Sequence, residues 1–401
     1  MQLLSERLKV IKPSPTLAVA QRATELQAQG IDIISLGAGE PDFDTPENIK
    51  EAAIDGIRRG ITKYTNVDGM PLLKQAIQGK FKRENNIDYQ LDEIIVGNGG
   101  KQVIYNLFMA SLNVGDEVII PAPYWVSYPD MTLLAGGVPV FVKCEMQNNF
   151  KLTPTALEHA ITAKTKWVII NSPSNPTGAT YSHDELVQLA EVVRKYPHIY
   201  VMSDDIYEHV VFDDFRFFTF AQVAPDLKDR IFIVNGVSKS YSMTGWRIGY
   251  GAGDKRLIKA MTILQSQSTS NPSSISQIAA IEALNGKQDF IKVNALEFQQ
   301  KRDLALSIFK RTKGLTCYKS EGAFYLFPDC KALFGLRDPR GKVINNSNDL
   351  GQYLLENANV AVVPGIAFGL DGYFRISYAT SLATIKTALE RIEAACNKLQ
   401  P

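Results

Sequence analysis

The chain has 401 residues, of which 43 are Lys or Arg and 42 are Asp or Glu, so its formal net charge is +1. This balance argues against a dedicated nucleic-acid-binding protein, which normally carries a basic excess. Hydrophobic residues make up 45% of the chain, which excludes a disordered protein, and the length predicts two domains.

Membrane and metal partners are not expected. No stretch of the sequence approaches the roughly 18 apolar residues that cross a membrane, and charges at Glu6, Arg7 and Lys9 interrupt any signal-peptide core. The four cysteines form no CxxC pair and the four histidines are scattered, which indicates neither a disulfide framework nor a metal site. We therefore expect a cytoplasmic protein.

Short apolar runs alternate with helix-length segments between about residues 90 and 255. The runs are rich in β-branched residues and nearly continuous, as in strands buried on both faces. The predicted strands are 118–120, 138–142, 167–171, 199–204 and 231–235. Ser182 and Glu185 form a capping-box pattern that opens a helix reaching Tyr196. This alternation predicts an α/β fold with a mostly parallel sheet flanked by helices.

The pattern changes towards the C-terminus. We expect a long helix over about 294–313, short strands at 324–326, 360–363 and 374–377, and a final helix from about 383 to 399. These elements predict a second, smaller α/β domain. The expected division is a large domain over residues 48–293 and a small domain made of residues 1–47 and 294–401.

Polar residues at the ends of the predicted strands are the first candidates for a site, because ligands bind outside the carboxyl ends of strands in open α/β sheets. Lys239 follows strand 231–235 among small and apolar residues. A desolvated lysine amine is neutral and can form a Schiff base with an aldehyde, although a lone loop lysine is usually a surface charge. Asp204 ends strand 199–204; it either caps a turn or pairs with the ring nitrogen of pyridoxal phosphate.

Two turns add further candidates. Residues 171–178 read Asn-Ser-Pro-Ser-Asn-Pro-Thr-Gly, a rigid turn that suits an amide hydrogen-bonding a ligand. Residues 97–102 read Gly-Asn-Gly-Gly-Lys-Gln and precede a predicted helix over 103–111. Glycines at a helix N-terminus let backbone N–H groups approach a phosphate, although a plain helix cap explains them equally well.

Taken together, these motifs resemble one family. The order is Asn-Pro-x-Gly from Asn175, Asp-x-x-Tyr from Asp204, Ser-Lys at 238–239, Arg247, and Phe-Arg-Ile-Ser at 374–377. This series is similar to the fold-type I aminotransferases of the aspartate aminotransferase family, from about Lys12 to the C-terminus. Segments 36–43, 123–128 and 244–247 resemble its bacterial branch, some members of which also use prephenate.

The resemblance implies a pyridoxal phosphate cofactor and a role for each matching residue. Lys239 binds the cofactor as a Schiff base and moves the proton. Asp204 pairs with the pyridine nitrogen, Tyr207 and Asn175 bond the ring oxygen, and Trp125 stacks on the ring. The residues implied at the phosphate are Gly99, Gly100, Lys101, Ser238, Arg247 and, from the neighbouring subunit of a homodimer, Tyr64. Those implied at the substrate, besides Trp125 and Asn175, are Gly39 and the α-carboxylate clamp Arg375.

The sequence departs from the animal and enterobacterial relatives at two places. Gly99 and Gly236 stand where those relatives carry hydroxyl residues, so phosphate binding should depend more on backbone N–H groups and Arg247. Residues 263–290 contain no arginine, although those relatives bind the distal carboxylate with one from this region. Lys101 and Lys12 are the candidates for that contact by resemblance to the bacterial branch.

We therefore expect an aspartate aminotransferase that transfers an amino group reversibly from L-aspartate to 2-oxoglutarate, with prephenate as an additional acceptor. An aromatic or alanine aminotransferase, or a β-lyase, on the same scaffold is the nearest alternative. A dinucleotide-dependent oxidoreductase would need a G-x-G-x-x-G turn in a first βαβ unit, which the sequence lacks. A non-catalytic regulator would need an appended DNA-binding segment, and no residues remain for one.

Overall fold

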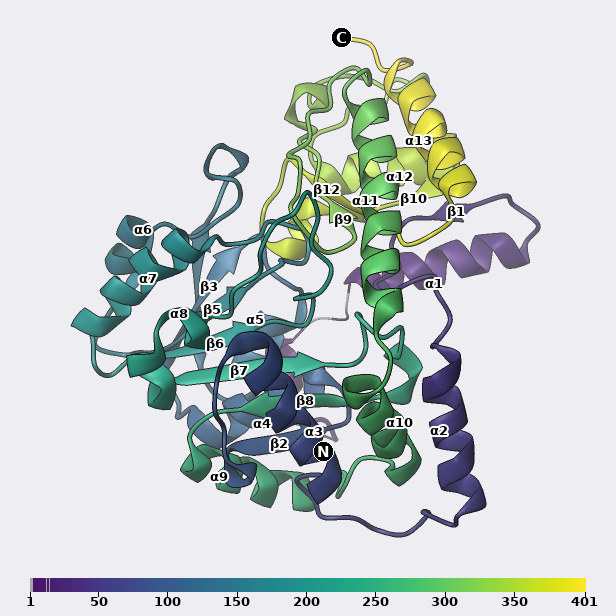
Figure 1. The fold of residues 1–401 in the computed structure, drawn as a ribbon. Coiled ribbons are helices and arrows are strands. Elements are labelled where there is room, and N and C mark those ends of the chain that lie inside the picture. The colour runs from purple at the N-terminus through teal and green to yellow at the C-terminus, as the bar shows by residue number, and fades with distance from the viewer. Residues whose placement is uncertain (1–2, 12, 14) are drawn as a thin grey trace.

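A seven-stranded sheet with the order β2-β8-β7-β6-β5-β3-β4 runs through the computed structural model, which describes residues 3–11, 13 and 15–401 (Figure 1). Its strands are β2 (Ile94–Gly97), β3 (Glu117–Ala122), β4 (Val138–Lys143), β5 (Thr165–Asn171), β6 (Tyr200–Asp204), β7 (Ile231–Gly236) and β8 (Gly249–Ala252). Strands β3 to β7 pair in parallel, whereas β8 is antiparallel to both β7 and β2. The predicted mostly parallel sheet is confirmed.

Each face of this sheet is covered by helices, because alternate residues of a strand point to opposite faces. In β7, Ile231 and Ile233 belong to one buried hydrophobic cluster, and Phe232 and Val234 belong to another. The first cluster includes α2 (Glu47–Arg58), α3 (Pro71–Lys80), α6 (Pro154–Ala160), α7 (His183–Lys195), α8 (Phe220–Val223) and α10 (Ser274–Asn285). The second includes α4 (Gly100–Ser111), α5 (Ser127–Leu134) and α9 (Lys255–Ser266).

The predicted capping box at α7 is present. The Glu185 backbone N–H donates to the Ser182 hydroxyl, and the Ser182 N–H donates to the Glu185 carboxylate. Two backbone donors that the helix cannot satisfy internally are thereby paired. The helix therefore begins directly after Ser182, and the chain returns along the sheet to start β6.

The C-terminal part has its own hydrophobic cluster, in which Phe324, Leu354 and Leu389 are fully buried. Its elements are α11 (Asp289–Phe309), β9 (Tyr325–Leu326), α12 (Ser347–Ala358), β10 (Val360–Ala361), β11 (Val363–Pro364), β12 (Phe374–Ser377) and α13 (Leu382–Cys396). Strands β11, β12 and β9 form an antiparallel sheet. The N-terminal elements α1 (Pro15–Ala28) and β1 (Ile34–Ser35) join this part, since β1 pairs with β10; Figure 1 shows α1 beside these helices.

Three predicted boundaries are wrong. The long helix spans Asp289–Phe309 rather than 294–313: Asp289 lies in its first turn, where an acidic side chain is favourable, and Gly314 turns the chain with φ +77°. The single strand expected at 360–363 is two strands that pair with different partners, β1 and β12. The last helix ends at Cys396 rather than at 399.

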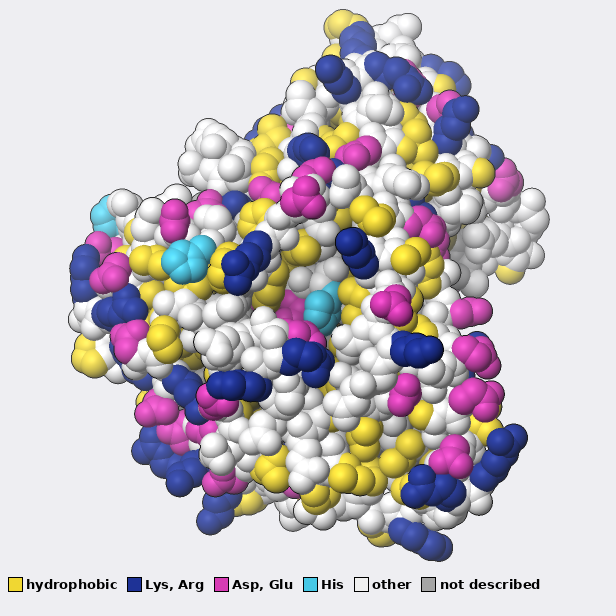
Figure 2. Space-filling view, viewed as in Figure 1, with side chains coloured by type: hydrophobic (Ala, Val, Ile, Leu, Met, Phe, Trp, Pro, Cys, Tyr) yellow, Lys and Arg dark blue, Asp and Glu magenta, His cyan; other side chains and the backbone are white. Residues whose placement is uncertain are grey.

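The surface has a mixed charge. Figure 2 shows acidic and basic side chains interspersed over the visible face, in keeping with the formal net charge of +1. Among the described residues, no helix combines the length and apolar character needed to cross a membrane.

Candidate functional site

A cavity of about 500 Å³ lies where the strands β5, β6 and β7 end. Residues at these ends are neighbours, since Asn171 pairs with Asp204, and Asp204 pairs with Val234 of β7. The predicted residues that line the cavity are Gly39, Gly100, Lys101, Trp125, Asn175, Asp204, Tyr207, Ser238, Lys239, Arg247 and Arg375. Candidates spread over more than 300 positions of the sequence therefore converge on one site.

Lys239 contributes an amine whose acidity is changed by its surroundings. Burial lowers the pKa of Lys239 to about 8, against the opposing effect of the Glu40 carboxylate, and the positive charges of Arg375 and Arg247 lower it further. Its Nζ donates a hydrogen bond to the backbone carbonyl of Gly39. Because the pKa lies near neutral pH, an appreciable fraction of the amine is unprotonated and nucleophilic.

Asp204 lies buried at the end of β6. Burial raises the pKa of its carboxyl to about 6, while the hydrogen bond from Tyr128 opposes this rise. The Tyr128 hydroxyl donates to Oδ2 across 2.5 Å, and the Ile206 backbone N–H lies 3.4 Å from Oδ1. Asp204 lines the cavity, and its Oδ1 has only this long contact among the described residues. Such a carboxylate is suited to a protonated ring nitrogen.

Arg375 reaches the same cavity from β12, and its side chain is buried. Its Nη1 donates to Oδ1 of Asn175 across 2.9 Å, and its Nη2 donates to the carbonyl of Gly37 across 2.7 Å. Its Nε has no hydrogen-bond partner among the described residues. Burial lowers the pKa of Arg375, but arginine stays charged in proteins. A buried guanidinium with a free donor favours a carboxylate ligand.

The turn before α4 forms a concave surface with Arg247. Gly99 has φ +86°, and a Cβ there would collide with the guanidinium of Arg247. A Cβ at Gly249 would collide with the backbone N of Gly100. Arg247 itself is held by hydrogen bonds from Nη1 to the Thr244 carbonyl (2.7 Å) and from Nη2 to the Asn98 carbonyl (3.3 Å). Backbone N–H groups at a helix start and an adjacent arginine together can bind one phosphate.

Lys101 extends over the face of Trp125, with Nζ 5.0 Å from the ring centroid. Burial and the charge of Arg247 lower its pKa. The Trp125 ring meets Tyr128 edge-on, with centroids 5.2 Å apart. The lysine, the tryptophan and the Tyr128–Asp204 pair therefore form one wall of the cavity.

Two of the predicted residues that the structure describes, Gly99 and Tyr64, do not line the cavity. Gly99 lies directly beside it through its contact with Arg247. Tyr64 is 92% exposed and lies outside it, so within one chain it does not reach the site. Lys12 lies outside the described residues.

Among the lining residues outside the predicted set, Tyr128, Tyr325 and Asn171 contact predicted residues through their side chains. The Asn171 side chain accepts the backbone N–H of Asn175 and donates to the backbone carbonyl of Asp204, so it links the two predicted groups. The Tyr325 hydroxyl lies 2.8 Å from that of Tyr207. Tyr128 lies in segment 123–128, which carried the resemblance, and Asn171 lies in the turn over 171–178, but no local pattern reveals what their side chains contact.

A buried ionic cluster lies outside this cavity. Glu84, Glu208 and His209 bring ligand atoms within 4.8 Å of one another, although the histidines are scattered in sequence. Lys80 is completely buried and lies 2.5 Å from the Glu208 carboxylate, and His209 bonds Glu84 across 2.9 Å. The ammonium of Lys80 already supplies the positive charge there, so the cluster is an ion-pair network.

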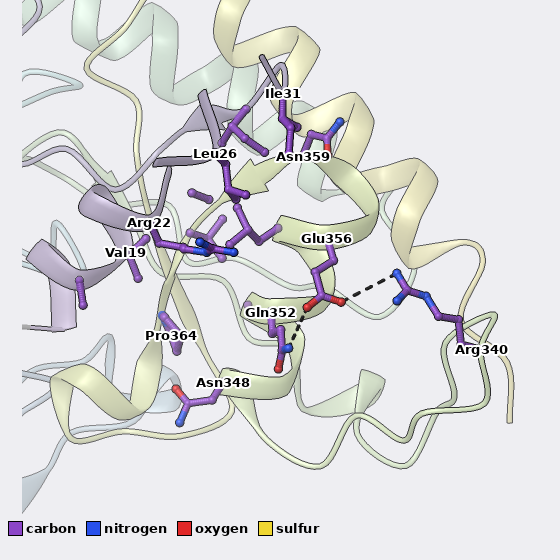
Figure 3. A pocket seen from close by; sticks show the side chains of 16 residues that line it. Val19, Arg22, Leu26, Ile31, Arg340, Asn348, Gln352, Glu356, Asn359 and Pro364 are labelled. Carbon is purple, nitrogen blue, oxygen red and sulfur yellow. Dashed lines mark hydrogen bonds and ion pairs between the residues drawn. The ribbon is translucent and has the colours of Figure 1, made fainter. Parts of the chain in front are cut away.

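A second cavity of about 750 Å³ lies between α1 and α12, and Figure 3 shows its lining. Val19 and Leu26 contribute apolar surface from α1, and Glu356 pairs with Arg340 at 3.8 Å on the other side. None of the predicted site residues within the described part of the chain lines it. The candidate site is therefore the smaller cavity at the strand ends.

Comparison with known proteins gives matches over nearly the whole chain. Residues 31–392 match the family described as aminotransferase class I and II. The chain is 71% identical to a probable aspartate/prephenate aminotransferase of Rickettsia felis, covering 100% of this chain and 98% of the relative. A solved aspartate aminotransferase from Rhizobium meliloti superposes with a TM-score of 0.97 at 53% identity, over 100% of both chains. One from Thermus thermophilus, with maleate, gives 0.92 at 42% identity over 98% and 100%.

Proposed function

Because the chain belongs to the class I and II aminotransferases, we propose that it transfers the amino group of L-aspartate to 2-oxoglutarate and also accepts prephenate. The convergence of Lys239, Asp204 and Arg375 on one cavity carries this proposal. The family works with pyridoxal phosphate, which, when bound, acts as an electron sink for the negative charge left on the substrate α-carbon.

The residues present fit this cofactor. A Cβ at Gly99 would displace the Arg247 guanidinium from its present position. Because this guanidinium adjoins the start of α4, it and the backbone N–H groups there can share one phosphate. Gly100, Lys101 and Ser238 adjoin this cradle, and Ser238 and Lys239 are neighbours in sequence. Lys239 would hold the cofactor covalently, and Asp204 would pair with its ring nitrogen.

Lys239 is the proposed proton carrier. With cofactor and substrate bound, the amine of Lys239 would act at the substrate α-carbon. A pKa of about 8 would let the neutral amine take the α-proton, and the resulting ammonium would give it back at the C4′ position of the cofactor. A single buried group therefore acts first as base and then as acid.

The remaining groups hold the reacting atoms in place. The Asp204 carboxylate keeps a proton on the ring nitrogen, and the Tyr128 hydroxyl steadies that carboxylate. Tyr207 and Asn175 would bond the ring oxygen, and Trp125 would cover the ring face. These contacts orient the ring against the substrate and exclude water from one side of it.

Arg375 is the proposed clamp for the substrate α-carboxylate, next to the backbone of Gly39. Its unpaired Nε and its planar fork favour a bidentate contact. The distal carboxylate of aspartate would meet Lys101, whose Nζ lies over Trp125, and Lys12. Maleate, named with the Thermus thermophilus relative, is also a dicarboxylate, which supports a two-carboxylate site; an aromatic or alanine aminotransferase is the alternative.

The proposed enzyme is a cytoplasmic homodimer with shared active sites. Tyr64 is almost fully exposed on a single chain, so its proposed contact with the phosphate needs a second subunit. We also propose the division into a large domain of residues 48–293 and a small domain of residues 1–47 and 294–401. The separate hydrophobic clusters of the sheet and of the C-terminal part support this division.

An absorbance spectrum before and after addition of L-aspartate tests the proposed function. We expect a visible cofactor band that disappears with aspartate and returns with 2-oxoglutarate. Repeating the titration with glutamate, alanine and phenylalanine ranks the donors. A band that ignores aspartate but responds to alanine or phenylalanine would favour the alternative. A protein that shows no band even with added pyridoxal phosphate would contradict the role of Lys239.

A further inference from the structure

Tyr325 lies between two groups with different proposed tasks. Its hydroxyl is 2.8 Å from that of Tyr207, and its ring centroid is 4.6 Å from the guanidinium carbon of Arg375. Its side chain is completely buried and lines the cavity. We propose that Tyr325 is a positioning residue that orients the carboxylate clamp and strengthens the ring-oxygen donor, an inference that rests on the proposed roles of Arg375 and Tyr207.

The first task concerns the plane of the clamp. The Arg375 guanidinium lies over the ring of Tyr325 and also over that of Phe368, 5.1 Å away. Its two terminal nitrogens are bonded to Asn175 and to the Gly37 carbonyl. These two bonds fix the plane of the guanidinium, and the attraction of the cation to the Tyr325 face holds it there. Tyr325 therefore helps to maintain the plane in which the arginine presents its free donor to a carboxylate.

The second task follows from counting protons. A phenol has one hydrogen to donate, and the two hydroxyls are too close to be unbonded. If Tyr207 donates its hydrogen to the cofactor ring oxygen, it must accept the hydrogen of Tyr325. Donation to the Tyr207 oxygen polarises its O–H bond, and a chain of hydrogen bonds strengthens each member. Tyr325 thus makes Tyr207 a better donor.

The fold couples the contact with Arg375 to the contact with Tyr207. Tyr325 on β9 pairs with Ser377 on β12, and Arg375 lies two residues from Ser377 on the same strand. Residues two apart in a strand point to the same face. Tyr207 follows β6, on the other side of the cavity, 118 residues before Tyr325. Any displacement of this strand pair therefore changes the clamp and the hydroxyl pair at once.

Two variants of the loaded enzyme separate the tasks. Y325F removes only the hydroxyl, and Y325L removes the ring as well. The matched control is Y353F, which deletes a buried tyrosine hydroxyl bonded to the Ala395 carbonyl across 2.8 Å, away from the cavity. The readouts are the pH at which the visible cofactor band changes and the dissociation constant of succinate, an unreactive dicarboxylate, measured by calorimetry.

A weaker Tyr207 donor leaves more negative charge on the ring oxygen, which holds the adjacent proton more tightly. We therefore expect Y325F to raise the midpoint of the spectral titration by about one pH unit, the size of one hydrogen bond, with succinate binding within about twofold of wild type. Y325L should also weaken succinate about tenfold, the size of a buried cation–π contact. Y353F should change neither readout.

The controls Y207F and R375A identify which statement fails. If Y207F shifts the titration and Y325F does not, the donor task is wrong. If R375A loses succinate and folded Y325L keeps it, the orienting task is wrong. If neither control has an effect, the proposed roles of Tyr207 and Arg375 fail, and this inference with them.

Discussion

The Tyr128 hydroxyl donates to Oδ2 of Asp204 across 2.5 Å, and both side chains are buried. This bond joins α5 to the end of β6 and leaves Oδ1 with only the Ile206 N–H at 3.4 Å. Burial nevertheless raises the pKa of Asp204 to about 6. The carboxylate is therefore costly to keep ionised until a positive group enters the cavity.

Asp204→Asn should consequently stabilise the cofactor-free protein. The pKa of Asp204 is about 6 in the folded protein, above its ordinary value of 3.8. The contribution of this carboxyl to the free energy of unfolding is therefore greatest below about pH 4 and is lost as the carboxyl ionises between about pH 4 and 6. The asparagine variant avoids this loss. Its free energy of unfolding should exceed that of the wild type by about 3 kcal/mol at pH 8, because the pKa differs by about two units between the folded and unfolded states and each unit is worth 1.36 kcal/mol. Urea unfolding at pH 5 and pH 8 measures it. An equal increase in the free energy of unfolding at both pH values, or a decrease at pH 8, would contradict this role of the buried carboxyl.

Arg375→Ala should lower kcat/KM for every amino-acid donor. Losing two charge-assisted hydrogen bonds to the α-carboxylate costs about 3–4 kcal/mol, a fall of roughly 10²–10³-fold. Arg375→Lys keeps the charge but not the fork, so its loss should be smaller. Steady-state kinetics with aspartate, glutamate and alanine check this. A loss confined to one donor would mean that Arg375 does not bind the α-carboxylate.

Lys101→Met should raise KM more for amino-acid donors with two carboxylates than for donors with one. The substitution keeps much of the side-chain volume over Trp125 and removes the charge, so KM should rise about tenfold for aspartate and little for alanine. The control is Lys143→Met, at an exposed lysine of β4, which should alter neither. Equal effects of Lys101→Met on aspartate and alanine would reject the side-chain contact with the distal carboxylate.

Gly99→Ala should weaken cofactor binding. Gly99 (φ +86°, ψ 160°) and Gly60 (φ +70°) both have a positive φ, which costs alanine about 1–3 kcal/mol. Only at Gly99 does the added Cβ collide with Arg247; at Gly60 no described atom lies within 4 Å of it. Gly60→Ala therefore controls for the general effect of placing alanine at a positive φ. Titration of the cofactor-free variants with pyridoxal phosphate should show weaker binding for Gly99→Ala alone, and equal affinities would exclude the proposed phosphate cradle.

The strand-end residues could be predicted from sequence because their positions follow from the register of a parallel sheet. Asn171 and Asp204 end neighbouring strands, and Lys239 follows the next strand along, so the fold rule alone places them together. Lys101 and Arg375 needed the family resemblance, since nothing in their local sequence indicates what they face.

The hydrogen-bonded partners of these residues could not be predicted in this way. Tyr128 reaches Asp204 from 76 residues away and Tyr325 reaches Tyr207 from 118 residues away, and such contacts depend on how α5 and β9 pack. The division of 360–363 into two strands has a similar origin, because it is set by the partners β1 and β12. Strands β2 and β8 of the large sheet were not predicted: β8 reads Gly-Tyr-Gly-Ala and lacks a β-branched run, and β2 is only four residues long.

Mixing two defective variants tests the shared site. Tyr64 is 92% exposed and lies outside the cavity of its own chain, so we expect it to complete the site of the partner. A Lys239→Ala chain supplies an intact Tyr64, and a Tyr64→Ala chain supplies an intact Lys239. In a hybrid dimer, one site then combines both intact residues and the other lacks both. Unfolding equal amounts of the two variants together and refolding them should therefore restore activity or cofactor affinity above the average of the two variants. The expected recovery is about a quarter of the wild-type number of sites, because half of the dimers are hybrids and each hybrid has one intact site. If Tyr64 served its own chain, every site in the mixture would keep at least one defect. A mixture that forms dimers but is no more active than the average of its components would show that Tyr64 does not act across the interface.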